Sequence, residues 1–133
     1  MRVLIDTHTL IWYTTFGENL SLRAKQLIAS ERTNVEVSIA SLWEMSIKVA
    51  LGRLEVMGGF EALPEALQKF NIEILPLNFT HTLHQSILPF RNKHKDPFDR
   101  IIAAQAIVEG IDLISIDNNF DAYFAKTEVK RIW

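Results

Sequence analysis

Four carboxylates in this sequence stand where a metal-dependent reaction could be organised around them. Asp6 and Asp117 each follow a short aliphatic run that is typical of a buried strand. Asp99 stands in the first turn of an apolar helical segment, and Glu44 borders the apolar arc of another. If the four side chains converge, their repulsion calls for a hard divalent cation, Mg²⁺ or Mn²⁺, which prefers oxygen ligands. Such a cation activates water and stabilises a leaving phosphate oxygen, so the set predicts phosphodiester hydrolysis.

Two of the chain's acids, Asp96 and Asp99, stand at the head of one predicted helix. Asp96 before Pro97 is typical of an N-cap followed by a proline in the first helical position, which makes Asp99 the third helical residue. Gly110 predicts the end of the helix. Both acids therefore have a purely structural explanation, as a cap and as a charge at the positive end of the helix dipole. Few polar side chains follow Asp99, so we expect this helix to be packed on two sides.

Strand-like and helix-like segments alternate along the chain, and this alternation predicts an α/β fold. Strands are expected over 2–5, 35–38, 71–77 and 112–116 with an edge strand at 129–133, and helices over 7–16, 22–30, 39–51, 60–70, 78–88 and 97–109. We expect a single domain over residues 1–133, whose central, mostly parallel, twisted sheet carries helices on both faces. The carboxyl ends of the strands and the amino ends of the following helices then share one rim. Asp6, Asp99 and Asp117 would meet there, and Glu44 would approach from the side of its helix.

Other polar residues have ordinary structural explanations that stay open at this point. Glu44 and Lys48 stand four residues apart on the predicted helix 39–51, so an exposed ion pair is the alternative to a place in the site. His81 and His84 lie on one face of the predicted helix 78–88, without an HExxH pattern or a third ligand. We expect them to be polar surface histidines and not a zinc site.

The densest basic cluster of the chain lies directly before Asp96. Arg91, Lys93 and Lys95 either form a solvated loop, the usual fate of such a run, or contact phosphates beside the acidic helix start. The chain has 14 basic and 16 acidic residues and a net charge of −2, which argues against a protein that coats nucleic acid by bulk charge. Any contact with nucleic acid should therefore be local.

Composition narrows the remaining classes of function. A chain of 133 residues with 48% hydrophobic content fits one domain with a real core. The absence of cysteine excludes disulfides, thiol nucleophiles and thiolate metal sites. No apolar run is long enough to span a bilayer, and Asp6 comes too early for a signal peptide, so we expect a cytoplasmic protein. No P-loop, dinucleotide fingerprint or GxSxG elbow is present, which disfavours nucleoside-triphosphate hydrolysis, dinucleotide cofactors and acyl transfer.

The order and spacing of four segments resemble one known family over nearly the whole chain. The segments are Leu4-Ile5-Asp6-Thr7-His8-Thr9-Leu10-Ile11-Trp12, Ser41-Leu42-Trp43-Glu44-Met45-Ser46-Ile47-Lys48, Asp96-Pro97-Phe98-Asp99-Arg100 with its Ile-Ala-rich continuation, and Leu113-Ile114-Ser115-Ile116-Asp117. Together they are similar to the PIN-domain ribonucleases, and within that family to the VapC-type toxins of prokaryotic toxin–antitoxin pairs. Each segment alone is unspecific.

The resemblance implies a Mg²⁺- or Mn²⁺-dependent endoribonuclease whose four acids map onto Asp6, Glu44, Asp99 and Asp117, with Asp96 as a supporting group. It also implies an RNA substrate such as tRNA, a cognate antitoxin that blocks the site, and a homodimeric toxin. Two alternatives stay open. A haloacid-dehalogenase-like phosphatase would also place its nucleophile after a first strand, but it expects an acid where this chain has His8. A PIN-like module without catalysis would act through partner contacts alone.

Overall fold

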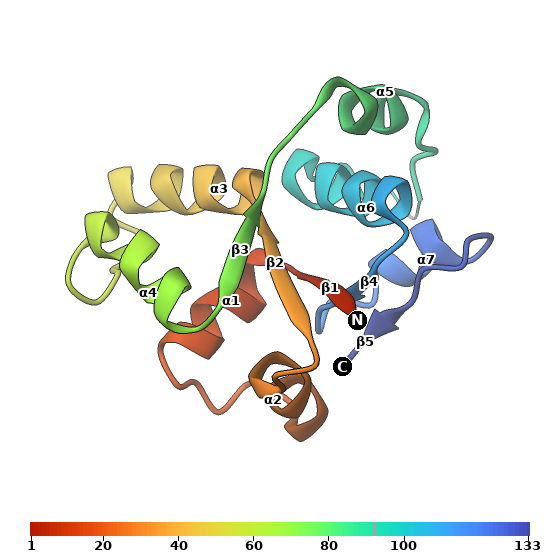
Figure 1. Cartoon of the computed structure of the whole chain (residues 1–133). Helices are drawn as coiled ribbons and strands as arrows, with labels where there is room; N and C mark the ends of the chain where they lie inside the picture. The colour runs from red at the N-terminus through yellow and green to blue at the C-terminus, as the bar shows by residue number, and fades with distance from the viewer. Residues whose placement is uncertain (92) are drawn as a thin grey trace.

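The computed structural model describes residues 1–91 and 93–133, and these form one five-stranded parallel sheet (Figure 1). The strand order is β3-β2-β1-β4-β5. The strands are β1 (Arg2–Ile5), β2 (Asn34–Ser38), β3 (Ile72–Leu75), β4 (Asp112–Ile114) and β5 (Arg131–Ile132). The helices are α1 (Thr7–Thr14), α2 (Leu22–Ala29), α3 (Ile39–Ala50), the 3₁₀ turn η1 (Phe60–Ala62), α4 (Leu63–Lys69), α5 (Phe79–Ile87), α6 (Pro97–Glu109) and α7 (Phe120–Phe124). The predicted α/β class and parallel sheet are confirmed.

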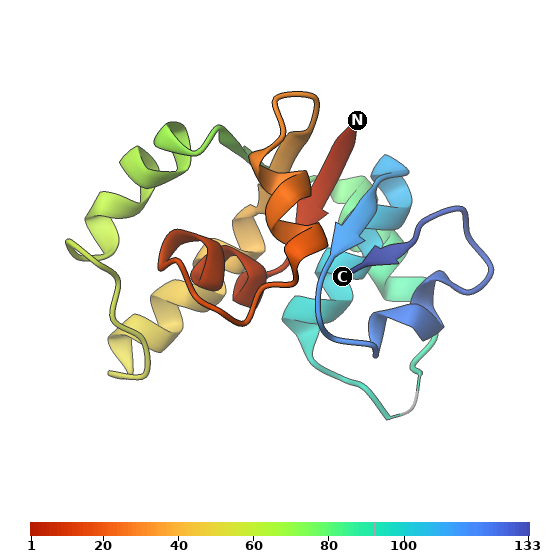
Figure 2. The ribbon, with the colours of Figure 1, turned by 90° about the horizontal axis from the view of Figure 1, so that it is seen from below.

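Helices cover both faces of the sheet, and β1 shows why its sequence is aliphatic throughout. Successive side chains of a strand point to opposite faces, and Val3, Leu4 and Ile5 are all fully buried. Val3 and Ile5 belong to a core with residues of α1, α2 and α4, whereas Leu4 packs with α6 and α7. Figure 2 shows these two groups of helices on opposite sides of β1. A strand buried on both sides cannot alternate, and the unbroken aliphatic run follows from this.

Helix α6 is packed on two sides, as its sequence predicts. Every residue from Arg100 to Ala106 is buried. Asp96 caps the helix by accepting hydrogen bonds from the backbone N–H groups of Phe98 (2.9 Å) and Asp99 (3.1 Å). Gly110 ends it in the left-handed conformation, with φ of 67°. The amino end of α6, with Asp99 in its first turn, is therefore fixed by both its cap and its core.

The strand order reverses at β1, and this reversal locates the rim where ligands bind in such folds. From β1 the chain proceeds to β2 and β3 on one side, and later returns to β4 and β5 on the other. The carboxyl ends of β1 and β4 are therefore neighbours at the switch point of the sheet, the usual place for a ligand. Ile5 pairs with Ile114, and the N–H of Asp6 donates to the carbonyl of Ile114 over 3.3 Å. The chain thus enters the candidate site from two adjacent strands.

The predicted elements are all present, with small differences at their ends. The helix predicted over 60–70 is divided near Pro64, as a proline there favours, into η1 and α4, which has Pro64 in its first turn. The apolar–polar alternation of residues 71–77 predicts one buried face, and this prediction is wrong, because Glu73 and Ile74 are both exposed on the edge strand β3. Within the described residues, no helix is both long and apolar enough to cross a membrane.

The prediction of a surface position for His81 is wrong, since its side chain is fully buried. Its Nδ1 accepts a hydrogen bond from the N–H of Asn78 (3.2 Å) in a capping box, which leaves Nε2 to donate to Glu109 over 3.0 Å. Glu109 also binds Arg2. The His81 bond, and then Arg2, hold the pKa of Glu109 below its ordinary value. The stability that results is present at neutral pH and lost as the pH falls through and below about 4.

Replacing His81 by Ala should lower the free energy of unfolding by about 2 kcal/mol, because a buried ring and two hydrogen bonds are lost. Urea unfolding followed by circular dichroism measures the effect. The matched control is His84→Ala on the same helix, whose half-buried side chain makes no comparable contact among the described residues and which should cost about 0.5 kcal/mol or less. Equal losses in the two variants would contradict the role given to His81.

Candidate active site

Asp6 ends β1 and caps α1, and its carboxylate is almost completely enclosed. The residue is 4% exposed. Its Oδ1 accepts hydrogen bonds from the N–H (2.9 Å) and hydroxyl (2.6 Å) of Thr9, and its Oδ2 accepts one from the Ser115 hydroxyl (2.5 Å). Burial raises the pKa of Asp6, although these hydrogen bonds oppose the shift. Asp6 is thus a carboxylate of fixed orientation in a place that disfavours its negative charge.

Asp117 follows β4 and reaches the same rim through Ser115. The hydroxyl of Ser115 accepts a hydrogen bond from the N–H of Asp117 (3.0 Å) while it donates to Asp6. Oδ1 of Asp117 accepts a hydrogen bond from the N–H of Asn119 over 2.9 Å, which shapes the turn into α7. One buried hydroxyl therefore connects the two strand-terminal acids.

Glu44 extends from α3 over the start of α1. It forms the predicted ion pair with Lys48 and also contacts the residue after Asp6. Its Oε1 accepts a hydrogen bond from the hydroxyl of Thr7 over 2.6 Å, while its Oε2 lies 3.3 Å from Nζ of Lys48. The Glu44 side chain is only 14% exposed. Thr7 directly follows Asp6, so the ion pair with Lys48 coexists with an orientation toward the predicted acids.

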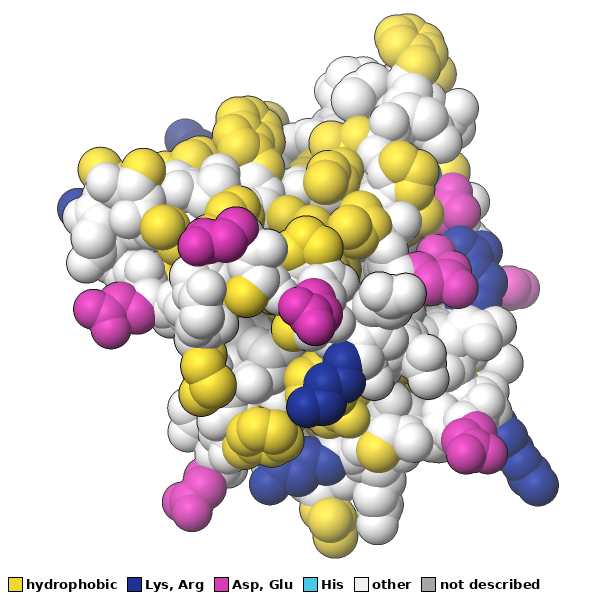
Figure 3. All heavy atoms as spheres, turned by 60° about the vertical axis from the view of Figure 1, so that its left-hand side comes forward, with side chains coloured by type: hydrophobic (Ala, Val, Ile, Leu, Met, Phe, Trp, Pro, Cys, Tyr) yellow, Lys and Arg dark blue, Asp and Glu magenta, His cyan; other side chains and the backbone are white. Residues whose placement is uncertain are grey.

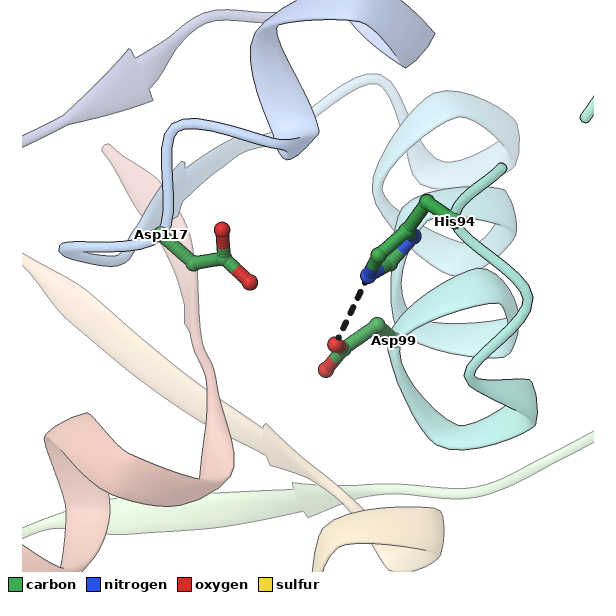
Figure 4. A group of neighbouring side chains, drawn as sticks. All are labelled: His94, Asp99 and Asp117. Carbon is green, nitrogen blue, oxygen red and sulfur yellow. Dashed lines mark hydrogen bonds and ion pairs between the residues drawn. The ribbon is translucent and has the colours of Figure 1, made fainter. Parts of the chain in front are cut away.

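Asp99 and Asp117 face each other across the rim, and His94 lies beside them (Figure 4). One possible ligand atom from each of the three side chains lies within 4.8 Å of the other two. Nε2 of His94 is 3.2 Å from Oδ2 of Asp99. No role was predicted for His94 from the sequence, although its position five residues before Asp99, just ahead of the same helix, was a usable signal.

The three other predicted acids and Asp96 act electrostatically on the carboxyl group of Asp99. Burial raises the pKa of Asp99 to about 7, and the negative charges of Asp96, Asp117, Asp6 and Glu44, in that order, add to the effect. Of the predicted acids, Asp99 and Asp117 belong to the group of possible ligand atoms, whereas Asp6 and Glu44 do not. Asp6 is joined to Asp117 through Ser115, and Glu44 contacts Thr7, the residue after Asp6.

The loop between α5 and α6 is anchored by a buried arginine. The guanidinium of Arg100 donates hydrogen bonds to the carbonyls of Leu88 (2.7 Å) and Gln85 (3.3 Å) at the end of α5. It also lies 3.9 Å from the ring centre of Phe90. Because Arg100 belongs to α6, these contacts fix the loop relative to the helix that carries Asp99.

The basic residues of this loop lie at the surface beside the acids. Arg91, Lys93 and Lys95 are exposed. The N–H of His94 donates to the carbonyl of Arg91 (2.7 Å), and Lys93 takes the left-handed conformation with φ of 60°. The His94 ring points toward Asp99. The site thus combines an acidic centre with a basic border.

The donor set fits a hard divalent cation. Carboxylate oxygens are the ligands that Mg²⁺ and Mn²⁺ prefer. Burial raises the pKa values of Asp6 and Asp99, and the charges of neighbouring carboxylates raise that of Asp99 further. Among the described residues, the ammonium group of Lys48 forms an ion pair with Glu44. A bound cation would offset the remaining repulsion.

Comparison with known proteins assigns a family to this arrangement. Residues 3–125 match the sequence profile of the PIN domain. The chain belongs to the PIN domain family. No curated protein matches this PIN domain at a significant level. The dehalogenase alternative has no support from this family match, and His8 stands where that alternative requires an acid.

Solved structures share the fold of this PIN domain along almost their full length. VapBC2 from Rickettsia felis, bound to a DNA fragment from its promoter, gives a TM-score of 0.69 at 17% identity and covers 98% of each chain. VapBC-1 from nontypeable Haemophilus influenzae gives 0.66 at 18% identity, again with 98% of each chain. VapBC-5 from Mycobacterium tuberculosis, a member of a family of toxin-antitoxin systems, gives 0.62 at 18% identity, over 98% of this chain and 97% of that one. At these identities the likeness concerns the fold.

Replacing Asp99 by Asn should stabilise the metal-free protein at pH 8. A native pKa of about 7 lies above the ordinary value near 3.8, so native stability falls as the pH rises between the two. The Asp99→Asn variant lacks this penalty and should unfold with a free energy higher by about 2 kcal/mol at pH 8, with the difference vanishing toward pH 4. Urea unfolding with a chelator present measures this, and a less stable variant at pH 8 would contradict the raised pKa of Asp99.

Proposed function

We propose that this PIN domain is a Mg²⁺- or Mn²⁺-dependent endoribonuclease and the toxin of a toxin–antitoxin pair. The proposal is supported by the grouping of possible ligand atoms from Asp99, Asp117 and His94, and by the Ser115 hydroxyl that joins Asp117 to Asp6. Family membership supports a nuclease, and the toxin–antitoxin complexes among the structural matches support the toxin assignment. We place the whole activity in residues 1–133 and in the cytoplasm.

The four acids have different roles in this proposal. Asp6 and Asp99 hold the cation directly, because one is fixed by three hydrogen bonds and the other by a capped, buried helix. Glu44 and Asp117 complete the ligand shell and orient the attacking water. When bound, Mg²⁺ or Mn²⁺ supplies the positive charge that activates water and stabilises the leaving oxygen. Asp96 supports Asp99 by capping its helix.

The RNA backbone is proposed to cross the loop that carries the basic cluster. Arg91, Lys93 and Lys95 are exposed and precede the acidic helix start, where they can contact phosphates on either side of the cleaved bond. The net charge of −2 leaves such local contacts to supply the attraction. A structured RNA, such as tRNA, would present several phosphates to this border at once.

Glu44→Gln and Asp99→Asn should each lower RNA cleavage at least a hundredfold, since each removes a negative charge from the ligand set. The measurement is cleavage of a mixed RNA pool with Mg²⁺ or Mn²⁺, resolved on a denaturing gel. Glu65→Gln, an exposed carboxylate on α4, is the matched control and should cleave normally.

Cleavage that persists in a chelator or in Asp99→Asn would overturn the enzyme proposal and leave a module that acts through partner contacts. The toxin assignment adds a separate requirement. A small protein encoded beside this chain should co-purify with it and abolish cleavage, and the absence of such a protein would remove the antitoxin from the proposal.

A homodimer is proposed through the apolar face formed by α3, α5 and β3. The face consists of exposed apolar side chains at intervals of one helical turn, namely Ile39, Trp43 and Ile47 on α3 and Phe79, Leu83 and Ile87 on α5, together with Ile74 and Leu77 near β3. Apolar side chains gather over the upper half of the molecule in Figure 3, with most charged side chains around and below them. Contiguous apolar surface of this kind marks an interface. A second copy offers the same apolar face in return.

Leu83→Glu should convert the dimer into a monomer, because each subunit would bury a carboxylate at the interface without a partner. Light scattering coupled to size-exclusion chromatography measures the mass. Leu22→Glu is the matched control, since Leu22 is 71% exposed on α2, outside the proposed interface. A monomeric native protein would contradict the proposed dimer. A dimer that survives Leu83→Glu would contradict this interface.

A further inference from the structure

The imidazole of His94 is held at the mouth of the site by contacts on both ring nitrogens. Nδ1 lies 2.9 Å from the hydroxyl of Tyr123, and Nε2 lies 3.2 Å from Oδ2 of Asp99. The side chain is 12% exposed. The ring therefore has a fixed orientation, with Nε2 directed at a predicted metal ligand (Figure 4).

The surroundings of Tyr123 fit a neutral His94 ring that carries its proton on Nδ1. The hydroxyl of Tyr123 donates to the carbonyl of His94 (3.1 Å), and its oxygen can then accept a hydrogen bond from Nδ1 over 2.9 Å. In that tautomer Nε2 presents a lone pair 3.2 Å from a carboxylate oxygen of Asp99. A cation bound by both atoms would satisfy them together.

We propose that His94 is a nitrogen ligand of the divalent cation, acting through Nε2 beside the carboxylates of Asp99 and Asp117. The inference rests on the proposed metal-dependent function and assigns that metal site a ligand outside the four acids. Neighbouring ligands of an octahedral cation lie about 3 Å apart when each is about 2.1 Å from the metal, close to the separation observed here. All three candidate ligand atoms lie within 4.8 Å of one another.

The hydrogen bond to Tyr123 is what such a ligand requires on its other side. Metal-binding histidines donate their second ring N–H to an acceptor, which fixes the tautomer and the ring orientation. Tyr123 is 5% exposed and supplies that acceptor from α7, while its own proton is used by the His94 backbone. His94 and Tyr123 therefore form a ligand and its support.

A nitrogen donor changes which cation the site prefers. Mg²⁺ selects oxygen ligands, whereas the later first-row ions bind imidazole more strongly. We therefore expect the site to favour Mn²⁺ and Co²⁺ over Mg²⁺ to a degree that depends on His94. Replacing His94 should weaken Mn²⁺ and Co²⁺ binding by roughly tenfold or more, and Mg²⁺ binding by less.

Pulsed electron paramagnetic resonance of the Mn²⁺-loaded full chain tests this directly, since a directly bound imidazole nitrogen gives a characteristic ¹⁴N coupling. The native protein and the control His84→Gln should show the coupling, and His94→Gln should lack it. Tyr123→Phe should retain the coupling with weaker Mn²⁺ binding by calorimetry. Circular dichroism of each variant confirms that it is folded.

The possible failures of this inference and of the proposed function are distinct. If the native chain binds Mn²⁺ and cleaves RNA without a nitrogen coupling, or if the coupling survives in His94→Gln, His94 is not a ligand and the nuclease proposal stands. If the native chain binds neither Mn²⁺ nor Mg²⁺ in calorimetry, both proposals fall together.

Discussion

The parallel pairing of β1 with β4 is the constraint on which the site depends. It brings together the segments that follow these two strands and carry Asp6 and Asp117, although the two residues are more than a hundred positions apart in the chain. The ladder continues into the site through the N–H of Asp6, and the hydroxyl of Ser115 then connects both acids. A shift of this pairing by one residue would turn Ser115 to the other face of the sheet and separate the two carboxylates.

The acidic site lowers the stability of the metal-free protein. Burial raises the pKa values of Asp6 and Asp99, and neighbouring carboxylates add to the shift at Asp99, so the metal-free protein bears a free-energy cost that the surrounding core must offset. The offset comes from two apolar cores on either side of the sheet and from a helix that is buried over most of its length. Acidic groups under such strain are common at functional sites, where a ligand relieves the repulsion.

Much of the fold followed from the sequence because its elements have strong local signals. The aliphatic run of β1 and the Asp96-Pro97 start and Gly110 end of α6 needed no tertiary information. His81 was misjudged because burial depends on a partner, Glu109, that lies 28 positions away in the chain. His94 was overlooked although Asp99 follows it by five positions, and its other partner, Tyr123, lies 29 positions away. The positions of the acids were predicted from the rule that the carboxyl ends of parallel strands and the amino ends of the following helices share one rim. That rule says nothing about the side chains around the acids.

The contacts of Arg100 have a consequence for the sequence of α6. Its planar guanidinium donates hydrogen bonds to the carbonyls of Gln85 and Leu88 and lies 3.9 Å from the ring centre of Phe90. A lysine carries its charge on one tetrahedral nitrogen and could not make the two hydrogen bonds and the ring contact together. Two neighbouring residues of α6 therefore divide two tasks between them, because Asp99 faces the acidic rim while Arg100 holds the end of α5 against the helix.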